Sequence, residues 1–240
     1  MTRETNLHLV VPDDRDFETV ATLDDARLTQ HDIRSHEITR ARRALAYLKD
    51  RIGDDAMRAL LADDITGMMQ IVRGWAAASD GGWRSAAVTL TVPGPGADAF
   101  RDWYADVVAG RRSAALRAGH PEHYLNTPGP DGIEVIEPIG ETDAPWHILY
   151  RTVDPTGDLP VQWPDSFPVR FAAEIVDMAG LRVGYSLRAL RDVPDAMEIR
   201  LVTCLPSATP DAVVSRHLRH LAIEYRNWIA LASAELAQRS

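Results

Sequence analysis

The sequence predicts an α+β fold in which a strand-rich middle is closed by one long C-terminal helix. Five runs rich in β-branched and aromatic residues follow one another between residues 133 and 204, with turn residues between them. One helical pattern then runs from about residue 210 to residue 238, with apolar residues along one side. An antiparallel sheet must bury one of its faces, and a helix of this length can cover that face.

Residues 1–82 are expected to form a small helical subdomain. A helical pattern with apolar residues on one face covers 35–52, and Gly53 ends it. Further helices are expected after Gly53 and over 65–78, before an Asp-Gly-Gly break. Residues 1–34 carry little pattern. The helix over 35–52 is amphipathic enough either to pack on its own domain or to form the interface of a homodimer.

Residues 83–240 are expected to form the main domain. A strand over 88–92, a Pro-Gly-Pro-Gly turn and a helix over about 98–110 lead into the sheet, and 126–132 is interpreted as a loop. The predicted arrangement is that of the helix-grip (START-like) fold, in which the sheet wraps around the last helix and leaves a cavity between them. The main strands of the sheet are expected at 133–139, 147–153, 169–176, 181–190 and 197–204.

Composition narrows the classes of function. The 240 residues are 45% apolar and 25% charged, as in ordinary globular proteins, and the net charge is −9. This charge disfavours nucleic acid and anionic membranes as partners, because both require a basic surface. We find no apolar stretch of membrane-spanning length and no targeting signal, so we expect a soluble cytoplasmic protein. The single cysteine, Cys204, excludes an internal disulfide and is interpreted as a buried strand thiol.

Two groups of polar residues have the spacing of metal ligands. His220 and Glu224 are one helical turn apart in the last helix, so they can aim an imidazole and a carboxylate at one point. A histidine and a glutamate from elsewhere would complete a zinc site. The other group reads Gly-His-Pro-Glu-His-Tyr-Leu-Asn over 119–126. Its proline predicts a rigid turn from which His123 could present a ligand, and His120 could be a supporting group or simply exposed.

Other motifs are interpreted without a catalytic role. Arginines flank His217, so we expect this histidine to be exposed. His147 stands at the start of a strand and is expected to be structural or exposed. The chain carries neither a phosphate-binding glycine loop nor the Gly-x-Ser-x-Gly turn of serine hydrolases.

These motifs together resemble a known family. The stretch from Trp103 through the His-Pro-Glu-His of 120–123 to the Glu-Val-Ile-Glu-Pro-Ile-Gly of 134–140, with the late pair His220 and Glu224, resembles the 2,4-diacetylphloroglucinol hydrolase family, which includes phloretin hydrolase. The resemblance covers roughly residues 85–235. It implies a helix-grip domain preceded by helices. It also implies a zinc ion, held by two histidines and two glutamates, that cleaves a carbon–carbon bond between an acyl group and a phenolic ring.

The resemblance also implies roles for individual residues. Asn126 matches a polar residue that the family uses on its substrate. Strand alternation puts Glu134 and Glu137 on opposite faces, and a one-residue error in register would exchange them, so either could be the strand ligand, with Glu137 the better match. The implied metal ligands are His123, Glu137, His220 and Glu224.

The chain departs from the family in its proton-transfer groups. A tyrosine that the family places before the first ligand falls on Ala115, and no histidine stands between His147 and His217. A ring carbon must be protonated before the acyl group can leave, and we name His120 and Tyr185 as candidates for this step. Trp103 and Trp228 are expected to line the cavity around a small aromatic or polyketide-like substrate.

Two alternatives stay open. A set of two histidines and two glutamates suits zinc but would also accept iron, manganese or cobalt. The chain could instead be a helix-grip polyketide cyclase or a hydrophobic-ligand-binding protein without hydrolytic activity, since the cavity of such a fold suits either role. Stoichiometric metal in the purified protein would separate the hydrolase from these alternatives.

Overall fold

The computed structural model describes residues 19–23 and 26–239. The chain divides into two compact units between Leu48 and Lys49. In the first unit, strands β1 (Ala21–Leu23) and β2 (Ala26–Leu28) pair in antiparallel fashion, and helix α1 (Gln30–Ile52) begins. Thr29 and Asp32 cap this helix reciprocally, because each side chain accepts a hydrogen bond from the backbone N–H of the other. The helix therefore starts earlier than its apolar pattern predicts.

The second unit contains one large antiparallel sheet. Its seven strands lie in the order β3-β9-β8-β7-β6-β5-β4. The strands are β3 (Trp83–Val92), β4 (Leu125–Gly129), β5 (Gly132–Glu137), β6 (Trp146–Val153), β7 (Val169–Asp177), β8 (Arg182–Val193) and β9 (Ala196–Pro206). The helices are α2 (Asp54–Leu60), α3 (Ala62–Ala78), α4 (Ala97–Ala109), α5 (Ser113–Arg117) and α6 (Asp211–Ala237).

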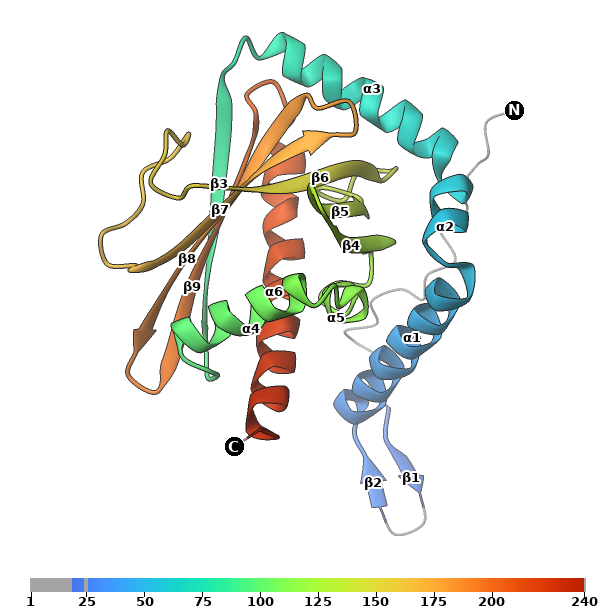
Figure 1. The fold of residues 1–240 in the computed structure, drawn as a ribbon. Helices are drawn as coiled ribbons and strands as arrows, with labels where there is room; N and C mark the ends of the chain where they lie inside the picture. The colour runs from blue at the N-terminus through green and yellow to red at the C-terminus, as the bar shows by residue number, and fades with distance from the viewer. Residues whose placement is uncertain (1–18, 24–25, 240) are drawn as a thin grey trace. The chain divides into compact units, whose positions relative to one another are not determined.

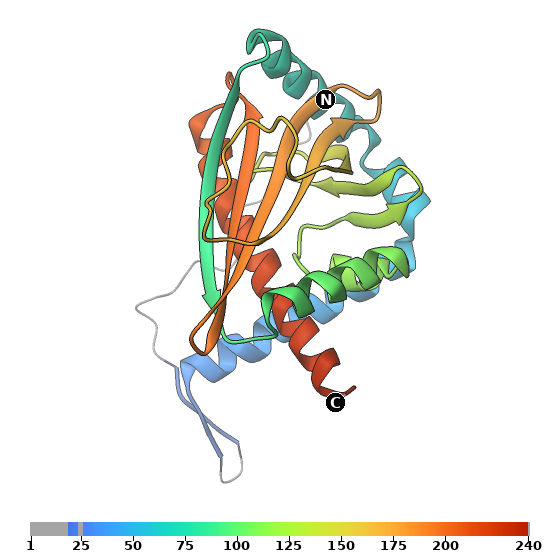
Figure 2. The same cartoon turned by 60° about the vertical axis from the view of Figure 1, so that its left-hand side comes forward.

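The last helix packs along the sheet and confirms the predicted fold class. Figures 1 and 2 show α6 running across one face of the curved sheet, with α4 crossing the same region. Buried residues of α4, β8, β9 and α6 form one apolar cluster, which includes Phe100, Leu190, Ile199, Tyr225 and Trp228. This is a helix-grip sheet closed by a long C-terminal helix.

A second apolar cluster ties α3 to the sheet. Ile65, Met68, Met69 and Val72 lie buried on one face of α3 and join residues from β5, β6 and the start of α6. Helix α3 therefore belongs to the second compact unit, which begins at Lys49. Whether residues 1–82 form a separate subdomain, and whether they mediate a homodimer, stay predictions.

The strand over Leu125–Gly129 is a correction to the sequence interpretation, which treated 126–132 as a loop. It pairs with β5, with Pro128 opposite Ile133. Because β4 is the edge strand of the sheet, a proline costs it no bond to an outer neighbour. The asparagine, proline and glycine of this segment indicated a loop, but an edge strand can accommodate them.

Two expectations about the whole chain can be compared with the described residues. None of the helices described is both long enough and apolar enough to cross a bilayer. The expected lack of a targeting signal concerns residues 1–18, which lie outside the described part. Cys204 is buried in β9, as expected, and burial raises the pKa of its thiol to about 12.

Candidate metal centre

Four side chains that are far apart in the sequence meet at one buried point. The Nε2 atom of His123 lies 3.1 Å from Oε2 of Glu137, 3.2 Å from Oε1 of Glu224 and 3.3 Å from Nε2 of His220. The Nε2 atom of His220 lies 3.1 Å from the same oxygen of Glu137. All four residues are buried. The structure thus brings together the complete set of predicted ligands, here called the His₂Glu₂ cluster.

The turn after α5 fixes the tautomer of His123. Its Nδ1 lies 3.1 Å from the carbonyl oxygen of Leu116. A carbonyl oxygen can only accept, so Nδ1 must carry the proton and donate it. In the neutral ring, Nε2 then presents its lone pair to the cluster. A hydrogen bond from the ring nitrogen that does not bind the metal orients a histidine ligand toward that metal.

A buried lysine holds the same turn in place. Nζ of Lys49 donates to the carbonyl oxygens of Pro121 and His123 at 2.5 and 2.6 Å. Burial, with a smaller contribution from the charge of Arg117, lowers the pKa of Lys49 to about 8. Both bonds go to backbone carbonyl oxygens, so the role of the lysine is to position the backbone that carries His123.

Replacing Lys49 with methionine is expected to destabilise the protein by about 1–3 kcal/mol, because two carbonyl oxygens lose their donor. It should also weaken metal binding, since the His123 turn is then free to move. Urea denaturation measures the first effect and metal titration the second. Arg58→Met, which breaks an ion pair with Glu134 outside the cluster, is the matched control. A Lys49→Met variant with the metal affinity of the wild type would contradict the positioning role.

Strand alternation decides between the two candidate glutamates. Glu137 points inward at the end of β5, opposite Trp146 of β6, and is only 2% exposed. Glu134 points outward, where its carboxylate accepts hydrogen bonds from Arg58 and lies 2.7 Å from Nε2 of His147. The structure therefore places Glu137 in the cluster. It also gives His147 a structural partner.

The inner face of α6 supplies the other two cluster residues. His220 and Glu224 stand one turn apart and both face the sheet. His217, one turn earlier, is 2% exposed, so the expectation that it is exposed is wrong. Its arginine neighbours Arg216 and Arg219 lie on the outer side of the helix near Glu141, while the 3.6-residue period carries His217 inward.

His120 supports the cluster from one side. Its ring stacks on that of His220, with centroids 3.7 Å apart, and its Nδ1 accepts a hydrogen bond from the backbone N–H of Glu122. Burial and the nearby charge of His220 lower the pKa of His120 to about 2, so the ring is neutral at ordinary pH. His120, Glu122 and His220 also form a second group with ligand atoms close together, but this group shares His220 with the cluster.

The His₂Glu₂ cluster fits a divalent cation. Ligand atoms of His123, His220 and Glu224 lie within 4.8 Å of one another, and Oε2 of Glu137 lies 3.1 Å from Nε2 of each of the two histidines. Acceptor atoms packed this closely repel each other unless a proton or a metal ion lies among them. Two imidazoles and two carboxylates are ligands that zinc takes, so the donor set matches the ion that the resemblance implies.

Protons and metal should compete for this cluster. Burial alone would lower the pKa of His123, but hydrogen bonds and charges from Glu137 and Glu224 outweigh it and raise this pKa to about 10. We therefore expect the apparent zinc affinity to rise about tenfold per pH unit between pH 7 and pH 9, if one proton is displaced. Competition with a coloured chelator measures it. A pH-independent affinity would contradict the proton competition.

The same pKa sets the pH dependence of the metal-free fold. The folded-state pKa of His123 lies above its unfolded value of about 6.5. Its contribution to stability is therefore complete below about pH 6.5 and is lost as the pH rises toward 10.

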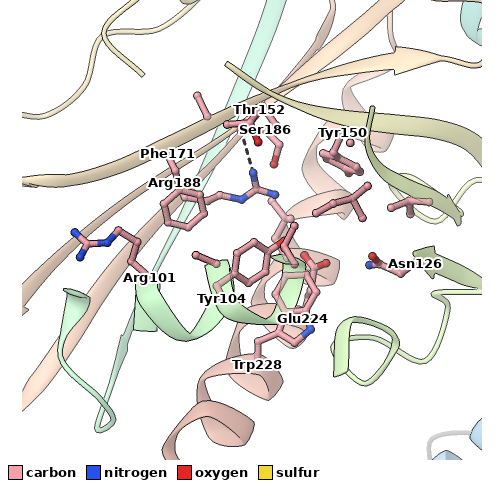
Figure 3. A pocket seen from close by; sticks show the side chains of 18 of the residues that line it. Arg101, Tyr104, Asn126, Tyr150, Thr152, Phe171, Ser186, Arg188, Glu224 and Trp228 are labelled. Carbon is pink, nitrogen blue, oxygen red and sulfur yellow. Dashed lines mark hydrogen bonds between the residues drawn. The ribbon is translucent and has the colours of Figure 1, made fainter. Parts of the chain in front are cut away.

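A cavity of about 380 Å³ lies beside the cluster, between α4, α6 and the sheet. Figure 3 shows Asn126 facing the cavity from β4 and Glu224 facing it from α6. Asn126 is buried, and its Oδ1 accepts no hydrogen bond from the described residues. Trp228 presents its ring, because its indole N–H donates to the carbonyls of Ala115 and Leu116. Asn126 and Trp228 therefore line the cavity, as expected.

Two predicted site residues lie away from the cavity: Trp103, expected to line it, and Tyr185, a candidate for proton transfer. Trp103 is buried in the apolar cluster between α4 and α6, where its indole N–H donates to Glu235. Its neighbour Tyr104 takes the place on the cavity wall. Tyr185 lies on the other face of β8, edge-on to Trp83, because successive strand residues point to opposite sides. Both residues are removed from the candidate site.

The cavity residues that the sequence interpretation missed include Tyr104, Tyr150 and Arg188. The hydroxyl of Tyr150 donates to Oε1 of Glu137 at 3.3 Å, which links the cavity to the cluster. Burial raises the pKa of Tyr104 to about 12. One signal was present, because Arg188 is a cation between the apolar residues Leu187, Ala189 and Leu190 of β8.

Comparisons with known proteins return structural likenesses only. No family model and no curated protein matches the chain. Ara h 8.0201 is similar to 63% of this chain over 98% of its own, at 14% identity and a TM-score of 0.41. Protein Ms6760 from Mycobacterium smegmatis covers 65% of this chain and 92% of its own, at 15% identity and a TM-score of 0.38.

A third similar structure is the di-domain ARO/CYC StfQ from the steffimycin biosynthetic pathway. It covers 92% of this chain and 69% of its own, at 13% identity and a TM-score of 0.35. Because the three TM-scores are low, these similarities do not indicate a function, and the geometry of the site must do so.

Proposed function

We propose that this protein is a metal-dependent hydrolase that cleaves the carbon–carbon bond between an acyl group and a phenolic or polyketide-like ring. One observation carries the proposal. The His₂Glu₂ cluster, assembled from the α5–β4 turn, β5 and α6, opens on a cavity through Glu137 and Glu224. A buried set of ligands that faces a ligand-sized space is the arrangement of a catalytic metal site.

The reaction requires one water and one proton transfer to carbon. The bond between ring and carbonyl carbon breaks, the ring carbon gains a proton, and the acyl carbon gains the hydroxyl of water to leave as a carboxylic acid. A divalent ion held by the cluster would polarise the substrate carbonyl and lower the pKa of water to about 7. Within the cavity the chain itself must bind the ring, exclude water and donate the proton.

Cavity residues are suited to these tasks. Asn126 is positioned to bind a ring hydroxyl, because its buried Oδ1 has no donor from the described residues. Tyr104 keeps its proton at neutral pH and lines the cavity, so it replaces Tyr185 as the first candidate for proton donation. Tyr150, hydrogen-bonded to Glu137, is the second candidate. The aromatic rings of Phe171 and Trp228 provide an apolar wall for the substrate ring.

A second function fits the cavity without the metal. A polyketide cyclase or a hydrophobic-ligand-binding protein would use the same enclosed space with aromatic walls. Such a protein would bind its ligand equally well after chelation. The hydrolase requires metal for turnover.

The test combines metal content with turnover. Protein purified without added metal is analysed for its elements and incubated with 2,4-diacetylphloroglucinol, and acetate release is followed. We expect about one zinc per chain and hydrolysis that chelation removes. Asn126→Ala and Tyr104→Phe should slow turnover without removing zinc. Metal-loaded protein that releases no acid from this substrate or from phloretin would overturn the proposal, and tight binding by metal-free protein would favour the second function.

A further inference from the structure

A buried arginine that faces the cavity has no acidic partner among the described residues. Arg188 lies in β8, is 8% exposed and lines the cavity. Figure 3 shows the guanidinium of Arg188 in the cavity, among the side chains of Tyr104, Tyr150 and Phe171. None of the carboxylates in the described part of the chain lies within ion-pair distance of it. A buried cation usually requires a compensating negative charge, so this arginine needs an explanation.

The protein satisfies only part of the guanidinium. Its Nε donates to the hydroxyl of Tyr225, and Nη1 lies 3.3 Å from the carbonyl oxygen of Ser186. The guanidinium carbon lies 5.5–5.9 Å from the ring centroids of Tyr150, Phe171 and Tyr225. Rings of this kind stabilise the positive charge through their faces. They hold the guanidinium in position but do not accept its in-plane N–H groups.

The remaining charges of the cavity do not neutralise Arg188. The other charged lining residues are Glu137, Glu224 and Arg101. The two glutamates contact His123 and are the proposed metal ligands, so a bound divalent ion would cancel their charge. Arg101 is half exposed at the rim and pairs with Asp98 and Asp102. The metal-loaded cavity therefore carries one net positive charge, that of Arg188.

We propose that Arg188 binds a carboxylate of the ligand, so that the cavity prefers aromatic or polyketide-like acids to neutral molecules of the same shape. The two terminal nitrogens of a guanidinium match the two oxygens of a carboxylate, and such paired hydrogen bonds are stronger than neutral ones. Binding the acid would supply the missing counter-charge of the cavity. This inference deepens the proposed function, on which it rests for the cavity being the ligand site.

The test compares two probes of nearly the same shape, of which one is charged and the other is neutral. 1-Naphthoate and 1-naphthamide have the same ring and nearly the same shape, and their dissociation constants are measured by calorimetry. Wild-type protein is expected to bind the carboxylate about tenfold more tightly or better, and Arg188→Met should remove this preference. Arg101→Met, which removes a rim cation, should keep the preference. Arg188→Lys should retain part of it.

A bound metal ion could also attract the carboxylate, so the wild type is measured again after treatment with EDTA, with metal loss verified by elemental analysis. A carboxylate preference should remain in this metal-free protein, smaller than in the metal-loaded protein because the charges of Glu137 and Glu224 are then not cancelled. Equal affinities for the two probes there, or an undiminished preference in Arg188→Met, would overturn the inference. If Arg188→Met does not fold, the affinities of the metal-free wild type and of Arg188→Lys for the two probes still test the inference. Protein that prefers naphthoate but holds no zinc would refute the hydrolase alone.

Discussion

Replacing His220 with alanine is expected to lower the apparent zinc affinity by about 100-fold or more and to leave the fold intact. The imidazole lies 3.1 Å from Glu137 and 3.3 Å from His123, so its loss removes one of four converging donors. The truncated side chain lies on the inner face of α6, whose other contacts with the sheet remain. Competition with a coloured chelator measures the affinity, and circular dichroism verifies the fold.

His147→Ala provides the matched control for this variant. His147 is also partly buried and also lies beside a glutamate, but that glutamate is Glu134 on the outer side of β5. Its removal should leave zinc binding unchanged. An equal loss of affinity in both variants, or wild-type affinity in His220→Ala, would show that the cluster is not the metal site.

Gly140→Ala is expected to lower the free energy of unfolding by about 3 kcal/mol or more. Gly140 follows β5 with φ +66°, and a Cβ built on it would lie 2.0 Å from the carbonyl oxygen of Val213. Val213 belongs to the first turn of α6, so relief of the clash requires movement of the helix that carries His220 and Glu224. Denaturation in urea measures the stability, and zinc titration should report a weakened site.

Gly180→Ala separates the clash from the backbone conformation. Gly180 has φ +87°, so alanine is strained there too, but no atom lies within 4 Å of the added Cβ. This variant should lose only about 1–2 kcal/mol. Equal losses at the two positions would mean that the close approach to Val213 is not important for stability.

Local patterns predicted most of the secondary structure, and the family resemblance implied the set of four cluster residues. The helical spacing of His220 and Glu224 is a local property, and strand alternation put Glu134 and Glu137 on opposite faces without deciding between them. The turn carrying His123 was indicated by its proline. In each case the decisive interaction lies within a few residues of the chain.

The cavity wall could not be predicted in the same way. Trp103 and Tyr104 are adjacent on one helix, and only the packing of α4 against the sheet decides which of them faces the cavity. Tyr185 and Ser186 differ by one strand position, with the same consequence. Arg188 can be recognised as a cavity residue only from the aromatic rings that distant segments bring around it. These are long-range effects without a local signature.

The most direct test of the central claim is the location of zinc in crystals of the zinc-loaded protein, by anomalous scattering at the zinc edge. We predict one anomalous peak per chain, surrounded by the side chains of His123, Glu137, His220 and Glu224. A peak at another position, or no peak in protein equilibrated with zinc, would contradict a metal centre at this cluster.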